Sequence, residues 1–198
     1  MLMKYFNCLA GMYVLVFLVA CSSAPSKEVI VIDKTLKTTL TVLKPLDQKS
    51  YSAGVAFMQS KDYVSAGTIF SNLLVAYPDL VGAHVNLAII DQHEGRVDQA
   101  LAGYHKSLEL NPNSLASLIQ SAVIYQDKGD FTKAETNLRR ALALKGDSAV
   151  VNYNLGVLYE LYLQEYELAI KYYRAYVELS QSEDVKTVER WIKLLERR

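Results

Sequence analysis

The chain has 198 residues, with 21 basic and 21 acidic side chains, so its formal net charge is zero. This length suits one compact domain, and the even charge balance gives no electrostatic reason to expect a nucleic-acid partner. Hydrophobic residues make up 51% of the chain, a high fraction for a soluble protein, and part of the excess lies in an N-terminal segment that we expect to be removed.

Residues 1–20 are typical of an export signal. Lys4 supplies an early positive charge, and a mostly apolar run without charges extends from Cys8 to Ala20. A membrane-spanning helix needs about 20 apolar residues, and this run is shorter. The pattern therefore favours a signal peptide at 1–20 over an anchor helix.

The end of this segment, Leu18-Val19-Ala20-Cys21, resembles the lipobox of bacterial lipoproteins. The resemblance implies cleavage before Cys21 and acylation of that cysteine, with palmitate among the acyl groups, so that the chain is anchored to a membrane by lipid. In that family an aspartate after the cysteine favours the inner membrane. Ser22 therefore implies the periplasmic face of the outer membrane. The alternative is an ordinary signal peptide followed by a chance cysteine.

The two cysteines leave no thiol for other chemistry. Cys8 departs with the signal peptide and Cys21 is acylated. We therefore expect neither a disulfide nor a thiolate metal site in the mature chain.

Residues 21–46 form a lipidated N-terminus, a short polar linker and a β-like arm. Residues 29–32 are all β-branched, a composition that favours a strand over a helix. Three interpretations of residues 29–43 stay open: an extended arm packed on the downstream domain, a segment that orders on a partner, and a short helix with Leu36, Leu40 and Leu43 on one face.

An internal repeat organises the chain from residue 47 to 181. Two sets of small residues recur at intervals of 34 or 35 residues and predict two closely packed helices per period. The first set is Gly54, Ala88, Ala122 and Gly156, and the second is Ala66, Ala100, Ala134 and Ala169. Aromatic residues keep the same phase at Phe57, Tyr125 and Tyr159, and at Phe70, Tyr104 and Tyr173. This pattern resembles the tetratricopeptide repeat family, and the resemblance implies an all-α solenoid of four helix-turn-helix repeats.

Local signals add detail to each repeat. In the first, helices are expected near 48–60 and 63–77, with Asp62 as N-cap of the second and Gly54 facing Ala66. Gly95 and Gly129 suit left-handed positions after helix ends. In the fourth repeat, the turn around 163–166 has one extra residue.

The fourth repeat is also rich in tyrosine, and the side chains beyond its two consensus aromatics suit either core packing or an interface. After Ser182, apolar residues at helical spacing predict a capping helix within 182–198. We expect Trp191 to belong to the core of this end.

The family resemblance implies that the first helices of the repeats line a concave groove that binds peptide segments. The positions that carry the family's groove here are Tyr51, Val55, Met58, Val85, Ile89, Gln92, His93, Ile119, Val123, Gln126, Asp127, Tyr153, Val157 and Glu160. They are mainly apolar and lack the cations that would clamp an acidic C-terminal peptide. The arm at 29–43 is an alternative occupant of the same groove.

No pattern in the sequence indicates catalysis. His84 and His93 lie nine residues apart on one expected helix, about 180° around its axis, and His105 lies on another. No phosphate-binding loop, metal-spaced cluster or nucleophile motif appears. We therefore expect a protein that is not an enzyme and needs no metal or cofactor.

The functional expectation is a membrane-tethered scaffold or assembly factor that binds protein segments for a cell-envelope machine such as a pilus-assembly or TonB-type system. This choice among pathways is an analogy at the level of fold. One alternative is a self-associating structural module, a homo-oligomer with arm 29–43 in a neighbour's groove. Another is an adaptor for periplasmic cell-wall hydrolases or proteases.

Overall fold

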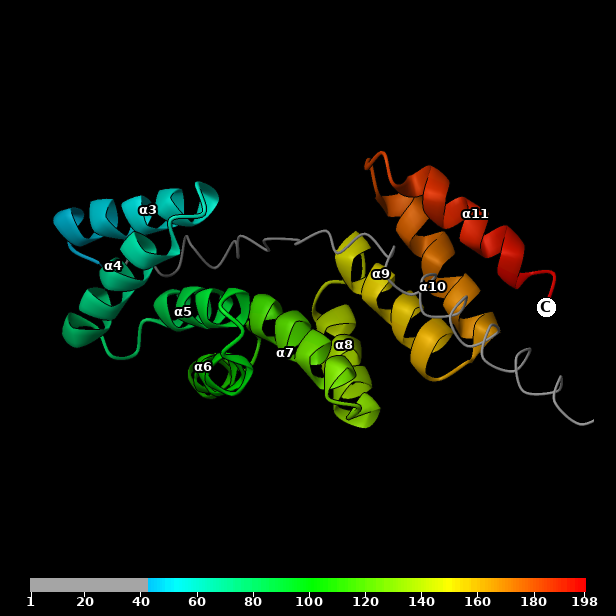
Figure 1. Ribbon diagram of the computed structural model, residues 1–198, viewed down its shortest axis with the longest axis horizontal. Helices are drawn as coiled ribbons and strands as arrows, with labels where there is room; N and C mark the ends of the chain where they lie inside the picture. The colour runs from blue at the N-terminus through cyan, green and yellow to red at the C-terminus, as the bar shows by residue number, and fades with distance from the viewer. Residues whose placement is uncertain (1–42) are drawn as a thin grey trace, which may run out of the picture. The chain divides into compact units, whose positions relative to one another are not determined.

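The computed structural model describes residues 43–198, and in this part of the chain all regular structure is helical (Figure 1). The helices are α3 Pro45–Gln59, α4 Tyr63–Ala76, α5 Val81–His93, α6 Val97–Leu110, α7 Leu115–Asp127, α8 Phe131–Leu144, α9 Ala149–Val157, the π-helix η1 Leu158–Tyr162, α10 Tyr166–Leu179 and α11 Val185–Leu195. The predicted signal peptide, Cys21 and residues 29–42 of the predicted arm lie outside the described residues. Leu43, the last residue of that arm, is buried.

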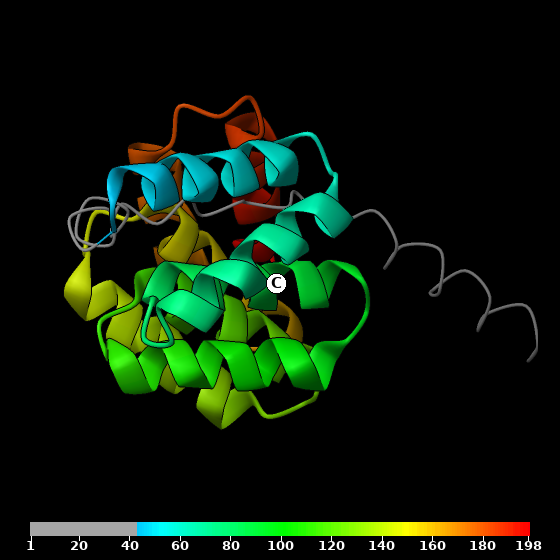
Figure 2. The ribbon, with the colours of Figure 1, turned by 90° about the vertical axis from the view of Figure 1, so that its left-hand side faces the viewer.

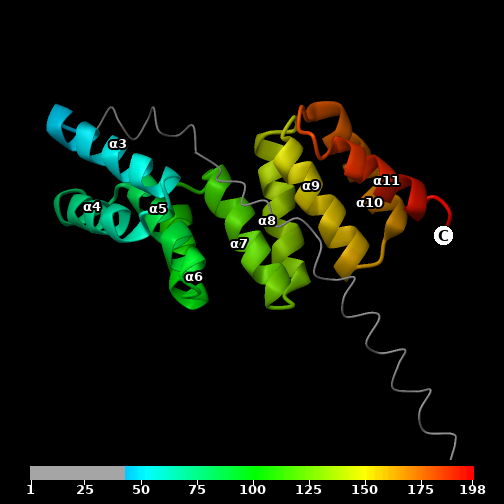
Figure 3. The same cartoon turned by 45° about the horizontal axis from the view of Figure 1, so that its top comes forward.

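The helices form four pairs, α3 with α4, α5 with α6, α7 with α8, and α9–η1 with α10, and each pair also packs against the next (Figures 1 and 3). Figure 2 shows the first pair from the front. All four alanines of the second repeating set are fully buried, because a small side chain is needed where two helices approach closely. The predicted fold class, an all-α solenoid of four helix pairs with a capping helix, is confirmed.

The turn within each pair contains one residue in the left-handed conformation. Gly95 and Gly129 occupy it in the second and third repeats with φ of 75° and 77°, as predicted. Lys61 and Gln164 occupy the same place in the first and fourth repeats with φ of 63° and 56°. A side chain with a Cβ is strained in this conformation, so these two turns carry a local cost that the glycine turns avoid.

Replacing Lys61 or Gln164 by glycine is therefore expected to stabilise the protein by about 0.5–1 kcal/mol at each site. The relief of backbone strain is larger than the extra conformational entropy that glycine loses on folding. Ser60→Gly is the matched control, because Ser60 has an ordinary φ of −82° and should lose stability. Thermal unfolding followed by circular dichroism measures both changes. A loss of stability in the Lys61 and Gln164 variants contradicts the expectation.

The extra residue of the fourth repeat lies inside the helix and not in the turn, so the predicted location was wrong. Residues Leu158–Tyr162 form a π-helical turn at the end of α9, with the Leu163 amide donating to the Leu158 carbonyl at 3.1 Å. A π-helical turn takes up one additional residue within a helix. The turn that follows then keeps the left-handed geometry of the other repeats.

Two glycines lie against an aromatic side chain of the second helix of their pair. A Cβ on Gly54 would lie 2.8 Å from Phe70 Cζ, and one on Gly156 would lie 2.4 Å from Tyr173 Cδ1. Gly54 therefore lies against Phe70, with Ile69 next at 3.2 Å, and the expected contact with Ala66 stays a prediction. The aromatic side chain of the second helix fills the space that each glycine leaves.

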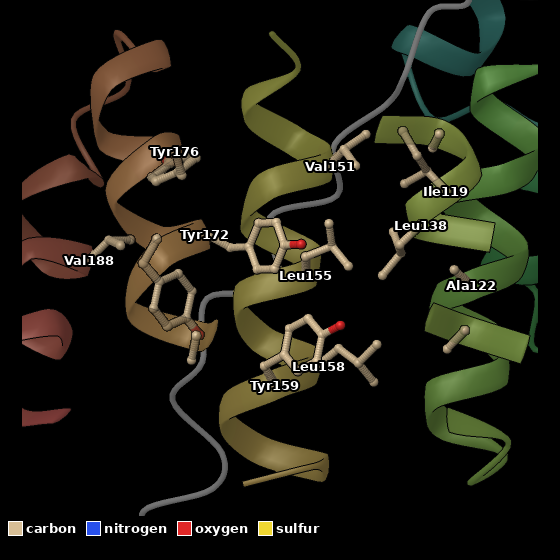
Figure 4. Close-up of a cluster of buried hydrophobic side chains, with 14 of the residues drawn as sticks. Ile119, Ala122, Leu138, Val151, Leu155, Leu158, Tyr159, Tyr172, Tyr176 and Val188 are labelled. Carbon is tan, nitrogen blue, oxygen red and sulfur yellow. The ribbon is translucent and has the colours of Figure 1, made fainter. Parts of the chain in front are cut away.

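The apolar core consists of two clusters of buried side chains. One is built on α3 to α6 with contributions from α7. The other is built on α7 to α11, and Figure 4 shows it with Leu138 from α8, Leu155 and Leu158 from the first half of the last repeat, and Tyr172 from α10. Successive repeats thus share their apolar surfaces, as a solenoid requires.

A small polar cluster lies where α6 meets α7. Ser107, Ser114 and Ser117 are fully buried. The Ser117 hydroxyl donates to Ser107 Oγ at 2.7 Å and the Ser114 hydroxyl donates to Ser117 Oγ at 3.0 Å. Buried hydroxyls are costly without partners, and these serines satisfy one another. Their small volume allows the second and third repeats to approach closely.

The capping helix α11 covers the end of the last repeat. Val188, Ile192 and Leu195 are buried on the face that packs against α10, while the charged residues of the helix, Lys186, Glu189, Arg190 and Lys193, are exposed. Trp191 packs against the same core but stays partly exposed. It is therefore a rim residue of this core.

Candidate functional site

The candidate site is the set of fourteen residues predicted to line the groove, hereafter the A-helix face. They lie on the first helix of each repeat, and the structure divides them by burial. Six are buried: Tyr51, Met58, Val85, Ile89, Ile119 and Gln126. Seven are partly exposed, namely Val55, Gln92, His93, Val123, Tyr153, Val157 and Glu160, and Asp127 is exposed.

The buried members serve the joints between repeats. Tyr51 packs edge-on against Phe70, with ring centroids 5.4 Å apart, and its hydroxyl accepts a hydrogen bond from Asn86 Nδ2 in the next repeat at 3.0 Å. Val85 and Ile119 belong to the two core clusters. The surface that a partner can touch is therefore narrower than the sequence suggested, and peptide binding by this face stays a prediction.

Val123 is the apolar member with the least internal role. It is partly exposed and packs against neither core cluster of the described chain. Val55 and Val157, at the same place in the first and fourth repeats, pack partly against those clusters. Val123 therefore contributes less to the core than these valines, and its exposed part is apolar surface available to a partner.

The polar members are held by neighbouring side chains. Gln92 Oε1 accepts from the Tyr104 hydroxyl at 2.9 Å, and Glu160 Oε2 accepts from the Tyr173 hydroxyl at 2.7 Å. Asp127 is exposed, but the protein around it partly desolvates its carboxylate and so raises its pKa. No lysine or arginine in the described part of the chain forms an ion pair with it. The face thus carries carboxylates and contains no lysine or arginine.

The three histidines are separate, as expected. His84 Nε2 lies 2.7 Å from the Pro78 carbonyl oxygen, His93 stacks on Tyr63 with centroids 4.6 Å apart, and His105 Nε2 lies 2.8 Å from the Tyr125 hydroxyl. Within residues 43–198, no group of three potential metal-ligating side chains lies together. No helix in this range is both long and apolar enough to cross a bilayer.

A hydrogen-bonded network joins the third repeat to the fourth. The Tyr159 hydroxyl donates to Glu135 Oε1 and accepts from Arg139 Nη2 at 2.7 Å, and Arg139 Nε donates to the same carboxylate oxygen at 2.7 Å. The pKa of Glu135 is lowered, most by the hydrogen bond from Tyr159 and next by the hydrogen bond from Arg139. The buried Tyr159 ring also stacks on Tyr172, with centroids 5.5 Å apart.

Tyr159→Phe is expected to cost about 1–2 kcal/mol at pH 7, because it removes a hydrogen bond to a charged group. The folded-state pKa of Glu135 lies below its unfolded value of about 4.3. The ionised carboxylate therefore stabilises the folded protein above that pH, and this stabilisation is lost as the pH falls through the folded pKa. The gap between wild type and variant should therefore narrow from pH 5 to about pH 3. Urea unfolding at several pH values tests this, and a constant gap contradicts it.

Four aromatic rings gather between α9, α10 and α11, and we call Tyr153, Tyr173, Tyr176 and Trp191 the C-terminal aromatic cluster. The centroid of Tyr153 lies 5.3 Å from Tyr176, 6.2 Å from Tyr173 and 6.5 Å from Trp191. Tyr173 and Tyr176 are buried, and Figure 4 shows Tyr176 at the edge of the core. The sequence indicated many tyrosines here but not that three of them pack together with the tryptophan.

Helix pairs in series, with a partly exposed strip along their first helices, define a helical-repeat scaffold. Two models described as Tetratricopeptide repeat match the sequence, one at residues 79–147 and one at residues 119–184. Together they span more than half of the chain. The protein belongs to the tetratricopeptide repeat family, whose members are protein-interaction scaffolds that generally lack catalytic activity.

Individual relatives agree with this assignment. The chain is 31% identical over 106 residues to the photosystem I assembly protein Ycf3 of Acaryochloris marina (strain MBIC 11017), a match that covers 49% of this chain and 64% of Ycf3. A tetratricopeptide repeat protein from Parabacteroides merdae superposes with a TM-score of 0.62 at 20% identity, over 76% of this chain and 60% of its own. The chain thus spans less than two thirds of the length of Ycf3 and less than two thirds of the length of the Parabacteroides merdae protein.

The crystal structure of MamA protein is also similar, with a TM-score of 0.60 at 18% identity over 76% of this chain and 88% of that chain. Identities of 18% and 20% establish a shared fold alone. The solved structures therefore support the architecture of the chain and leave its partner to be inferred from its own residues.

Proposed function

We propose that this protein is a lipid-anchored scaffold that binds a protein segment along the exposed part of the A-helix face and acts in the assembly of a cell-envelope machine. The observation that carries the proposal is the state of Val123. It is an apolar side chain on the predicted binding face that stays partly exposed and packs against neither core cluster of residues 43–198.

The chemistry of the face selects a class of partner. Its partly exposed apolar side chains suit a segment that presents hydrophobic side chains at regular spacing. A free C-terminal carboxylate is disfavoured, because the face offers carboxylates of its own at Asp127 and Glu160 and no lysine or arginine. The partner therefore approaches with apolar and neutral or basic groups.

Membrane tethering rests on the sequence at Leu18–Cys21 and on Ser22, which together resemble the signal of an outer-membrane lipoprotein. An acylated Cys21 places the repeats at the periplasmic side of the outer membrane. A role in assembly is supported by the similarity to Ycf3, a relative that is named as an assembly protein.

Anchoring is tested by labelling cells with radioactive palmitate and separating their membranes. The wild-type chain should take up label and sediment with the outer membrane, whereas Cys21→Ser should do neither. Label in the Cys21→Ser variant, or an unlabelled wild-type chain, contradicts the lipid anchor.

Binding is tested by purification of the tagged full chain from its own cells. Val123→Glu places a charge on the apolar face and should reduce recovery of its protein partner about tenfold or more. Thr136→Glu, an exposed position on the second helix of the same repeat, is the control and should leave recovery unchanged. Equal recovery from both variants contradicts binding through the A-helix face.

A further inference from the structure

The C-terminal aromatic cluster has the composition of a receptor for a cation. Tyr153 and Trp191 form its rim, and both are partly exposed. Tyr173, only 1% exposed, lies beneath them with its ring centroid 5.9 Å from that of Trp191. The faces of aromatic rings attract cations, and tryptophan does so most strongly.

Two carboxylates flank these rings. Glu160 is fixed by the Tyr173 hydroxyl at 2.7 Å, and Asp184, just before α11, accepts from the Ser182 hydroxyl at 3.1 Å. Burial raises the pKa of Tyr153, and the neighbouring Tyr176, Asp184 and Glu160 raise it further. Two carboxylates from separate segments, Glu160 in η1 and Asp184 before α11, therefore lie near enough to the rim to favour a cation there.

Elsewhere the chain places its own cations over aromatic rings. Lys133 lies over the Tyr125 ring, Lys171 over Tyr172 and Arg198 over Tyr166, at 5.3, 5.5 and 4.9 Å from the ring centroids.

The C-terminal aromatic cluster has no such internal cation among the described residues. Arg174 on α10 is paired with Glu196 at 2.6 Å, and Arg190 on α11 donates to the Thr187 hydroxyl at 3.1 Å. The cluster thus combines four rings with two nearby carboxylates, and no lysine or arginine of residues 43–198 lies over one of its rings.

We propose that this cluster binds an arginine side chain of the partner's protein segment, with its guanidinium stacked on the Tyr153 and Trp191 rings and paired with Glu160. Arginine fits better than lysine, because its planar group stacks on rings and bonds to carboxylates through several N–H donors. Tyr153 and Glu160 also belong to the A-helix face, so this proposal rests on the proposed function. It adds that the bound segment carries an arginine where it lies over the fourth repeat.

The test uses Trp191 as the reporter, since it is the chain's one tryptophan. The full chain in detergent is titrated with a short capped peptide that carries one arginine between leucines, and with the same peptide carrying citrulline, which keeps the shape and loses the charge. We expect a saturable fluorescence change, with binding of the arginine peptide about tenfold tighter. Equal affinities, or no saturable change with either peptide by fluorescence and calorimetry, overturn the proposal.

Variants connect the effect to the site. Glu160→Gln still accepts the Tyr173 hydroxyl but should abolish the preference for arginine over citrulline, and Tyr153→Leu should weaken binding of the arginine peptide about fivefold. Glu178→Gln, at an exposed position on α10, is the control and should change nothing. Retention of the full preference in Glu160→Gln also overturns the proposal.

The failure of this inference is distinguishable from failure of the proposed function. If Val123→Glu reduces partner recovery but the protein binds the arginine and citrulline peptides equally, the scaffold function stands and the arginine site is wrong. If the protein prefers the arginine peptide but Val123→Glu leaves partner recovery unchanged, binding along the A-helix face is wrong.

Discussion

Gly156→Ala is expected to destabilise the protein by about 2 kcal/mol or more, although alanine normally favours a helix over glycine by about 1 kcal/mol. The new Cβ would lie 2.4 Å from two carbons of the Tyr173 ring. That ring is buried and its hydroxyl is bonded to Glu160, so it has little room to move. Steric overlap therefore outweighs helix propensity at this position.

Gly67→Ala is the matched control for this substitution. Gly67 lies within α4, and a Cβ there would meet only Ile90 Cδ1, at 4.0 Å. This variant should gain about 1 kcal/mol from helix propensity. Urea unfolding followed by circular dichroism measures both, and a more stable Gly156→Ala contradicts the packing described. Tyr173→Leu added to Gly156→Ala should recover part of the loss.

Ile119→Ala and Val123→Ala are expected to act on different properties although they lie one turn apart on α7. Ile119 is 3% exposed within the larger core cluster, and its truncation should cost about 2–4 kcal/mol of stability. Val123 lies outside both clusters, so its truncation should cost less than about 1 kcal/mol and should instead weaken partner binding.

Stability is measured by chemical unfolding, and partner recovery is measured at a temperature where both variants are folded. A large loss of stability in Val123→Ala would place that side chain in the core. Loss of binding in Ile119→Ala alone would mean that the partner reads a different surface.

The sequence predicted the helix pairs because packing imposes the same requirement in every repeat. A small residue must lie where the helices meet, which is why Ala66 and Ala100 recur in phase. The turn glycines were also predictable, since Gly95 and Gly129 adopt a backbone conformation that strains other residues. Asp62 was correctly predicted as an N-cap, and it accepts a hydrogen bond from the Ser65 amide at 3.0 Å.

Other features depend on neighbours that the repeat pattern does not specify. Val85 and Ile119 belong to the A-helix face by position, but the adjacent repeat covers them. The extra residue of the fourth repeat could enter the turn or the helix, and the backbone took the π-helical form at Leu158–Tyr162. The meeting of Tyr153 with Trp191 depends on where α11 packs, which spacing within the helix leaves open.

The most direct test of partner binding along the first helices is photo-crosslinking in intact cells, from a photoreactive residue placed at Val123 in the full chain. The control carries the same residue at Lys106, which is exposed on α6. We expect the crosslinker at Val123 to capture a discrete partner protein and the crosslinker at Lys106 to capture none. Equal capture from both positions, or crosslinks from Val123 only to the protein's own chain, would contradict binding of an external segment along the first helices of the repeats.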